Sequence, residues 1–205
     1  MGDKRVVLKG SSPHFEVCFI CTGNRARSPV AQHTMSLATR TLPVVSRSVG
    51  LLDLGGAPAL PEIEQAARDR GLDLSAHRST CITSADLTST DLVLGFELQH
   101  VASAVVDHRA DPARTFTVPE LVRLLEGAES AETDPIARAR EVIATADGKR
   151  REQPRQRLEE VHDPIGEPGD VQRSIALQVH HMTLQLAEGL FGRSASLRSG
   201  GHAPV

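Results

Sequence analysis

Apolar residues in this chain gather in short runs, and segments with a helical pattern separate these runs. The first run, residues 14–20 (HFEVCFI), is apolar at nearly every position, which is typical of a strand buried on both faces of a parallel sheet. Three later runs predict strands at 43–50, at about 91–96 and at 114–118. Helices are predicted between and after these strands, at 28–42, 58–72, 97–108 and 119–127. Strands that alternate with helices predict an α/β fold in which helices cover a parallel sheet.

The same pattern predicts how the chain is divided. Residues 1–13 form a polar lead-in, and one domain is expected from 14 to 192. Within it, the segment from about 126 to 160 is charge-rich and poor in large apolar residues, so we expect a charged insert of one or two solvated helices with a loose linker. Residues 170–192 carry apolar side chains at helical spacing and predict a final amphipathic helix. The tail, 193–205, is predicted to be disordered.

Composition narrows the range of partners. The formal net charge is −3, tyrosine and tryptophan are absent and phenylalanine is scarce. A nucleic-acid binder is normally basic and stacks bases on aromatic side chains, so we expect no nucleic-acid partner. No apolar run is long enough to cross a membrane, the start lacks the apolar stretch of a secretion signal, and three irregularly spaced cysteines suit a reducing compartment. We therefore expect a cytoplasmic protein without a membrane partner, and the sequence leaves its oligomeric state open.

The first predicted strand leads into a loop with the sequence CTGNRARS (residues 21–28), which precedes a helix. In an open α/β fold this position lies at the carboxyl end of a strand, where active groups gather. Successive backbone N–H groups of the loop can surround an anion, and the helix N-terminus adds partial positive charge. Arg27 offers a planar fork that matches two phosphate oxygens. The residues predicted to surround the substrate are Thr22, Gly23, Asn24, Arg25 and Ala26.

Cys21, at the base of this loop, is the candidate nucleophile. The loop N–H groups, the helix terminus and the arginine favour its thiolate form, which can attack a phosphorus atom. Ser28 can donate a hydrogen bond to the sulfur and ease its departure, and it is also expected to cap the helix, with Pro29 at the first helical position. Gly23 and Asn24 both tolerate a positive φ, as a compact loop requires. The competing interpretation, a structural cysteine beside a surface arginine, agrees less well with the strand–loop–helix context.

Residues 17–31 (VCFICTGNRARSPVA) resemble the N-terminal signature of the low-molecular-weight protein tyrosine phosphatases. Later segments that resemble the same family are SRSVG (46–50), DLSAHRST (73–80), TDLVLGF (90–96) and HDPIGEP (162–168). The resemblance implies a four-stranded parallel sheet with helices on both faces. It also implies a phosphatase without cofactor or metal that hydrolyses phosphotyrosine in proteins, or a small phosphate ester, through a phosphocysteine. Ser48 and His77 are implied to hydrogen-bond the side chain of the loop asparagine and so support the loop.

A phosphatase of this kind needs a carboxylic acid that protonates the leaving oxygen and later activates water. The sequence offers three Asp-Pro pairs, at Asp111, Asp134 and Asp163, and each is also a typical turn. Asp163 is favoured because it lies in a loop rich in glycine and proline before the final helix, where the resembling family keeps its general acid. Asp111 lies beside a strand start, and Asp134 lies inside the charged insert.

Three features depart from the pattern of that family. Ala26 stands where many members carry a second cysteine, so a vicinal disulfide cannot shield Cys21. Ile165 and Gly166 stand where aromatic residues usually follow the Asp-Pro pair, which puts a strict preference for phosphotyrosine in doubt. Arg25 places a second guanidinium at the mouth of the site, where it is either solvated or recruits anionic groups.

Two other functions use the same loop. An arsenate reductase with a small-thiol reductant would attack arsenic with the same cysteine, and a non-catalytic module would bind phosphate without turnover. The complete set of Cys21, Arg27, Ser28 and Asp163 favours a catalyst over a binding module.

The remaining cysteines and a histidine pair are expected to be structural. Cys18 lies about 10 Å along an extended strand from Cys21, which is too far for a disulfide, so it is assigned to the core. Cys81 is also expected to be structural. The adjacent His180 and His181 do not have the spacing of metal ligands, and no metal site is expected.

Overall fold

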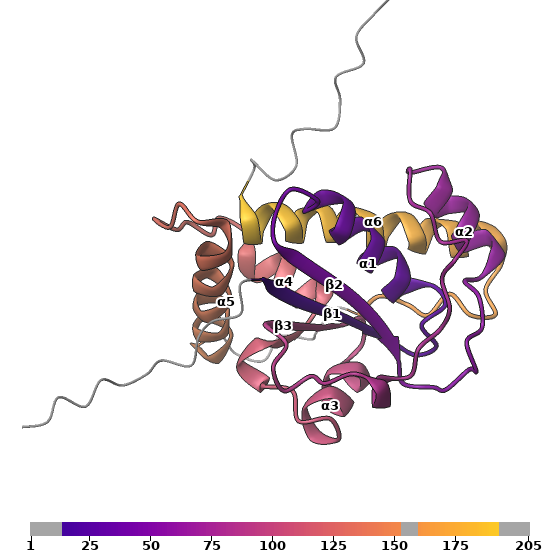
Figure 1. Cartoon of the computed structure of the whole chain (residues 1–205), viewed down its shortest axis with the longest axis horizontal. Coiled ribbons are helices and arrows are strands. Elements are labelled where there is room, and N and C mark those ends of the chain that lie inside the picture. The colour runs from indigo at the N-terminus through magenta and orange to yellow at the C-terminus, as the bar shows by residue number, and fades with distance from the viewer. Residues whose placement is uncertain (1–13, 153–159, 193–205) are drawn as a thin grey trace, which may run out of the picture.

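The computed structural model describes residues 14–152 and 160–192, and its centre is a four-stranded sheet (Figure 1). The strands are β1 (Phe15–Cys21), β2 (Val44–Gly50), β3 (Leu92–Gly95) and β4 (Thr115–Thr117). They lie in the order β2-β1-β3-β4, and each neighbouring pair is parallel. The parallel sheet and its four predicted strands are therefore confirmed, with bounds that shift by about one residue.

Helices follow each strand, as predicted. The α-helices are α1 (Arg27–Ala38), α2 (Pro61–Arg68), α3 (Leu98–Val106), α4 (Val118–Leu125), α5 (Pro135–Glu152) and α6 (Gly169–Phe191), and two short 3-10 helices are η1 (Ile82–Ser84) and η2 (Pro112–Arg114). The helix predicted at 58–72 is shorter than expected. Among the described segments, no helix combines the length and the apolar character that a membrane span requires. The predicted lead-in 1–13 and disordered tail 193–205 lie outside the described residues.

These helices cover both faces of the sheet, and β1 is buried between them (Figure 1). On one face, alternate side chains of β1, including Phe15 and Phe19, share a large core with α1, α2, α4 and α6. On the other face, Cys18 and Ile20 pack in a smaller core with Ala104 of α3. The prediction that this strand is buried on both faces is confirmed, and its last residue, Cys21, is buried as well.

The charged insert differs from the expectation. It contains α5, but this helix is not solvated on all sides, because one side of it is buried. The buried apolar side chains are Ile136, Ala139, Val142, Ile143 and Ala146. They belong to the large core, and α5 packs against α6 and α4. Arg150, near the end of α5, lies 4.1 Å above the Phe116 ring and donates to the Thr115 carbonyl at 2.8 Å. The expected loose linker falls partly on 153–159, which lie outside the described residues.

The first helix also begins differently from the prediction. α1 starts at Arg27 with Ala26 at the N-cap position, and no side chain caps it. Ser28 is therefore inside the first turn and Pro29 is the third helical residue rather than the first. The predicted cap was wrong because the serine hydroxyl bonds the sulfur and loop atoms described below. Without a side-chain cap, the first-turn N–H groups are left for another acceptor.

Candidate active site

The loop between β1 and α1 lies at the C-terminal edge of the central strand, where β1 ends on Cys21. The end of β2 passes directly against it. A Cβ atom at Gly50 would lie 2.7 Å from the Asn24 nitrogen and 2.8 Å from the Gly23 carbonyl carbon. Only glycine allows this close approach, so the neighbouring strand fixes the position of the loop from behind.

The Cys21 sulfur lies within hydrogen-bonding distance of two groups. The backbone N–H of Asn24 donates to Sγ at 3.2 Å, and the Ser28 hydroxyl lies 3.0 Å from it. Donors that point at a sulfur stabilise negative charge on it. The structure therefore places Ser28 where the sequence predicted, beside the sulfur of the candidate nucleophile.

Asn24 is fully buried and holds the loop in shape. It has a φ of 50°, as predicted, and its Nδ2 donates to Ser28 Oγ and Ser48 Oγ, both at 2.9 Å. Its Oδ1 accepts the N–H of Thr80 at 2.8 Å, and its backbone carbonyl lies 2.7 Å from His77 Nε2. The predicted contact with Ser48 is present, whereas His77 bonds the backbone rather than the predicted side chain. Thr80 was missed, because it acts through a backbone N–H.

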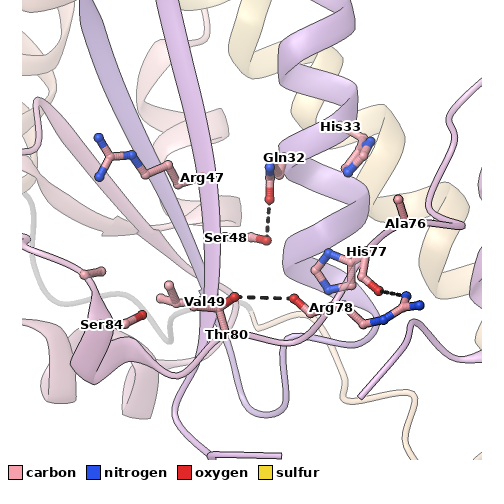
Figure 2. A pocket seen from close by; sticks show the side chains of 11 residues that line it. Gln32, His33, Arg47, Ser48, Val49, Ala76, His77, Arg78, Thr80 and Ser84 are labelled. Atoms are coloured by element: carbon pink, nitrogen blue, oxygen red, sulfur yellow. Dashed lines mark hydrogen bonds between the residues drawn. The ribbon is translucent and has the colours of Figure 1, made fainter. Parts of the chain in front are cut away.

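The supporting shell continues outward from the loop. Ser48 donates onward to Gln32 Oε1 at 2.5 Å, as Figure 2 shows on the wall of a cavity of about 460 Å³. His77 and His33 line the same cavity, and burial lowers the pKa of both rings. A carbonyl can only accept, so the neutral His77 ring carries its proton on Nε2 and donates it to Asn24.

Gly23 contributes differently from the expectation. Its φ is not positive, so the predicted left-handed conformation is found in this loop only at Asn24. Gly23 instead lies against two aliphatic side chains at the mouth of the site. A Cβ atom there would lie 3.1 Å from Leu54 Cδ1 and 3.5 Å from Ile165 Cδ1. The mouth therefore has aliphatic rather than aromatic side chains on two sides.

Arg27 is almost fully buried, and its guanidinium group donates hydrogen bonds to several parts of the chain. Nη1 donates to a Glu97 carboxylate oxygen and, at 2.7 Å, to the Val161 carbonyl. Nη2 donates to Thr22 Oγ1 at 3.0 Å and to an Asp163 carboxylate oxygen. These contacts join the loop, the end of β3 and the segment before α6. The arginine and Asp163, predicted separately, are thus brought together.

One donor of this arginine is left over. Arg27 Nε is buried and has no hydrogen-bond partner among the residues that the structure describes. A buried unpaired N–H is costly, and a donor on a charged group makes a strong hydrogen bond to an anionic oxygen. This atom is a candidate donor to a bound oxyanion.

Glu97 was missed by the sequence analysis. It is the first residue after Phe96 at the carboxyl end of β3 and precedes α3. A carboxylate at this edge of a parallel sheet is a signal that could have found it. Its side chain bonds Nη1 of Arg27, whereas Asp163 bonds Nη2.

The three candidate acids occupy different places. Asp163 contacts Arg27, keeps 28% of its side chain exposed and accepts the Ile165 N–H at 3.1 Å. Asp111 accepts the Ala113 N–H and caps η2, and Asp134 accepts the Ala137 N–H at the start of α5. The last two thus make the turn contacts expected of Asp-Pro pairs.

Arg25 lies at the mouth of the site and is hydrogen-bonded to the segment before α2. Its Nε donates to the Pro58 carbonyl at 2.7 Å, and its own carbonyl accepts the Leu60 N–H at 3.0 Å. The side chain is half-buried, so it is not simply solvated.

The other cysteines lie outside this arrangement. Cys18 is buried in the smaller core, and burial raises the pKa of its thiol to about 12. Cys81 is half-buried, with its sulfur 4.0 Å from the Leu51 carbonyl. His180 bonds the Thr34 hydroxyl at 2.9 Å. Within 14–152 and 160–192, no group of three or more His, Cys, Asp or Glu residues could hold a metal ion.

A parallel α/β sheet whose central strand ends on a thiol, with an arginine six positions later at a helix start, is the arrangement of the cysteine-dependent phosphatases. Comparison with known families narrows this class. Residues 16–147, more than half of the chain, match the family model of the low molecular weight phosphotyrosine protein phosphatases. The chain belongs to this family.

Similar proteins carry two kinds of substrate name. A probable low molecular weight protein-tyrosine-phosphatase, EpsP of Ralstonia nicotianae, is 33% identical over 109 residues, which are 51% of this chain and 71% of the relative. A protein-arginine-phosphatase of Bacillus subtilis is 34% identical over 112 residues, 52% of this chain and 72% of the relative. The crystal structure of a low molecular weight protein tyrosine phosphatase from T. tengcongensis matches with a TM-score of 0.62 and 25% identity, covering 85% of this chain and 98% of that one.

Proposed function

We propose that this protein is a phosphatase that removes the phosphoryl group from phosphotyrosine in proteins, with Cys21 as the nucleophile. Membership of the family supports the reaction class. The contacts of Cys21, Arg27 and Asp163 support the roles given to each residue. No step calls for a cofactor.

In the first step, the Cys21 sulfur attacks phosphorus as the bond from phosphorus to the leaving oxygen breaks. Asp163 gives its proton to that oxygen, so a neutral hydroxyl leaves. Arg27 and the amides of residues 22–26 hold the non-bridging oxygens and the charge that builds on them. Arg27 and Asp163 are in contact, so the acid is held within reach of the group that binds the phosphate.

In the second step, water attacks the phosphocysteine. Asp163, now a carboxylate, takes a proton from the water, and the bond between phosphorus and sulfur breaks to release inorganic phosphate. The Ser28 hydroxyl lies 3.0 Å from the sulfur and donates to it as it departs.

The observation that carries the proposal is the environment of the Cys21 sulfur. A backbone N–H points at it and the Ser28 hydroxyl lies 3.0 Å from it, and a buried arginine on the next helix offers an unpaired Nε. A merely structural cysteine needs neither. This combination is the one that a phosphate-binding nucleophile requires.

Hydrolysis of p-nitrophenyl phosphate tests the proposal directly. We expect turnover by the wild-type chain, none by Cys21→Ser, and a burst of nitrophenolate that reports the phosphocysteine. Asp163→Asn should slow phenyl phosphate, a poor leaving group, far more than p-nitrophenyl phosphate. Arsenate turnover with a thiol donor, or phosphate binding without any hydrolysis, would instead support the reductase or the non-catalytic module.

The identity of the phosphorylated residue needs a separate test. The mouth is aliphatic at Leu54 and Ile165, next to Gly23, and the Bacillus relative is named for phosphoarginine. We propose phosphotyrosine as the substrate and expect its peptides to give the higher kcat/KM in a panel with phosphoarginine peptides and small phosphate esters. A higher kcat/KM for the phosphoarginine peptides would mean that phosphoarginine is the substrate, while the role of Cys21 as the nucleophile would stand.

The expected setting of this activity stays a prediction. The free thiols and the composition suit a cytoplasmic enzyme that acts on phosphorylated proteins and does not bind nucleic acid.

A further inference from the structure

His100 is fully buried at the start of α3, beside the loop that carries the candidate nucleophile. Its Nδ1 accepts the backbone N–H groups of Phe96 at 3.3 Å and Glu97 at 3.0 Å. Gly95 makes room for it, because a Cβ atom at that glycine would lie 2.8 Å from the His100 Cβ. The ring is therefore held in one orientation by the end of β3.

The protonation of this ring follows from its partners. Backbone N–H groups only donate, so Nδ1 must be the unprotonated nitrogen. Burial, and then the nearby charge of Arg27, lower the pKa of His100 to about 4, so the ring is neutral near pH 7 and carries its one proton on Nε2. Nε2 lies 3.3 Å from Thr22 Oγ1 and is the donor in that contact.

The Thr22 hydroxyl therefore receives two hydrogen bonds. One comes from His100 Nε2 and the other from Arg27 Nη2, at 3.0 Å. A hydroxyl oxygen has two lone pairs and one proton. Because both lone pairs are taken by groups that cannot accept, the hydroxyl proton points away from both of them and is available to a third acceptor.

We propose that this third acceptor is an oxygen of the bound phosphoryl group, that Thr22 is a further catalytic residue, and that His100 is the positioning residue that turns its proton inward. Thr22 belongs to the loop that surrounds the anion, and its oxygen is bonded to Arg27, which holds the same anion. The inference rests on the proposed function. A fixed donor of this kind stabilises the charge that builds on the phosphoryl oxygens in the transition state.

Thr22→Val tests the role of the hydroxyl, since valine keeps the shape and removes the donor. We expect kcat on p-nitrophenyl phosphate to fall by about 100-fold, the low end of the loss caused by removing one fixed oxyanion donor. The affinity for vanadate, which mimics the five-coordinate phosphoryl group, should fall by a similar factor. Thr22→Ser restores the hydroxyl and should stay within a few-fold of wild type. An unchanged kcat and vanadate affinity in Thr22→Val would overturn the proposal.

A double-mutant cycle tests the role of His100. Asparagine at this position keeps an acceptor for the backbone but is too short to reach the threonine. His100→Asn should lower kcat by about 3- to 10-fold alone and by nothing further in the Thr22→Val background, because its effect passes through the hydroxyl. Independent, additive losses would mean a merely structural histidine and would refute the positioning role.

The pH dependence of kcat distinguishes a phosphoryl oxygen from Asp163 as the acceptor of the Thr22 hydroxyl. If the hydroxyl bonds Asp163 instead, Thr22→Val would shift the limb of the kcat profile that reports the acid and leave the plateau unchanged. We expect the reverse, a lower plateau with unshifted limbs. A wild-type chain that hydrolyses no phosphate ester would be a failure of the proposed function rather than of this assignment.

Discussion

Replacing Asn24 by alanine should remove much of the stability of the loop, because the asparagine side chain makes three buried hydrogen bonds. Two of them are donated to the hydroxyls of Ser28 and Ser48, and the third accepts the N–H of Thr80. The serine hydroxyls can turn to other partners, but the Thr80 N–H is left without its acceptor. The residue also has a φ of 50°, which alanine adopts less readily than asparagine.

The magnitude follows from these terms. Two lost donors contribute about 1 kcal/mol each, and the orphaned N–H costs about 1–3 kcal/mol. The left-handed conformation adds about 1 kcal/mol for alanine. We therefore expect the free energy of unfolding to fall by about 4–6 kcal/mol, a large share of the ~5–15 kcal/mol typical of a domain.

Urea denaturation followed by circular dichroism at 222 nm is the suitable assay, since the chain has no tryptophan or tyrosine for fluorescence. Ser48→Ala is the matched control, because it removes one of the three Asn24 bonds together with the Ser48 bond to Gln32, and it should cost about 2 kcal/mol. If Asn24→Ala lost no more than Ser48→Ala, the asparagine would not be the residue that holds the loop, and the reasoning would be refuted.

Three further predictions concern other parts of the molecule. The pKa of His100 is lowered from 6.5 to about 4, so the unfolded state binds more protons than the folded state between these pH values. The free energy of unfolding should therefore fall by up to roughly 3 kcal/mol as the pH drops from 6.5 to 4. His100→Asn should reduce this dependence of the free energy of unfolding on pH. Glu97→Gln removes the charge that orients Arg27 and should weaken phosphate inhibition by about 10-fold, the cost of one charged hydrogen bond. Arg150→Ala should lower the free energy of unfolding by about 1–2 kcal/mol, whereas the exposed Arg151→Ala should change it by less than about 0.5 kcal/mol.

Each of these has a clear contrary result. A pH slope that is the same in His100→Asn would mean that other groups cause it. Equal phosphate inhibition constants in Glu97→Gln and wild type would show that the other contacts of Arg27 suffice. Equal effects of the two arginine substitutions would mean that α5 is the solvated helix that the composition first indicated.

The fold was predictable where apolar periodicity is strong and less so where small or charged residues hide it. β1 and α6 were found within a residue or two because their patterns are long and regular. The buried side of α5 was missed, because it includes Ala139 and Ala146 and because the guanidinium group of Arg150 lies over the Phe116 ring. A search for apolar periodicity gives little weight to alanine and none to arginine, although both residues can be buried against a core.

The site was predictable only as far as it is local in the chain. Cys21, Arg27 and the residues between them follow from one short motif, whereas the partners of Arg27 come from far away. Glu97 is 70 positions from it and Val161 is 134, and the latter acts through a backbone carbonyl. The predicted helix cap was wrong for a related reason. Local sequence preference assigned Ser28 to the cap, whereas in the folded chain its hydroxyl contacts the Cys21 sulfur.

The pleat of the central strand has a consequence for oxidative damage. Cys18 and Cys21 belong to opposite cores, and Gly50 lies between the backbones of Cys21 and Cys81, pairing with each. Cys21 and Cys81 are thus separated by two strand spacings of about 4.8 Å each, which is beyond the span of a disulfide. A sulfenic acid formed on the nucleophile therefore finds no resolving thiol within its own chain. Recovery of activity after peroxide must depend on a thiol supplied from solution, such as a small reductant or another protein.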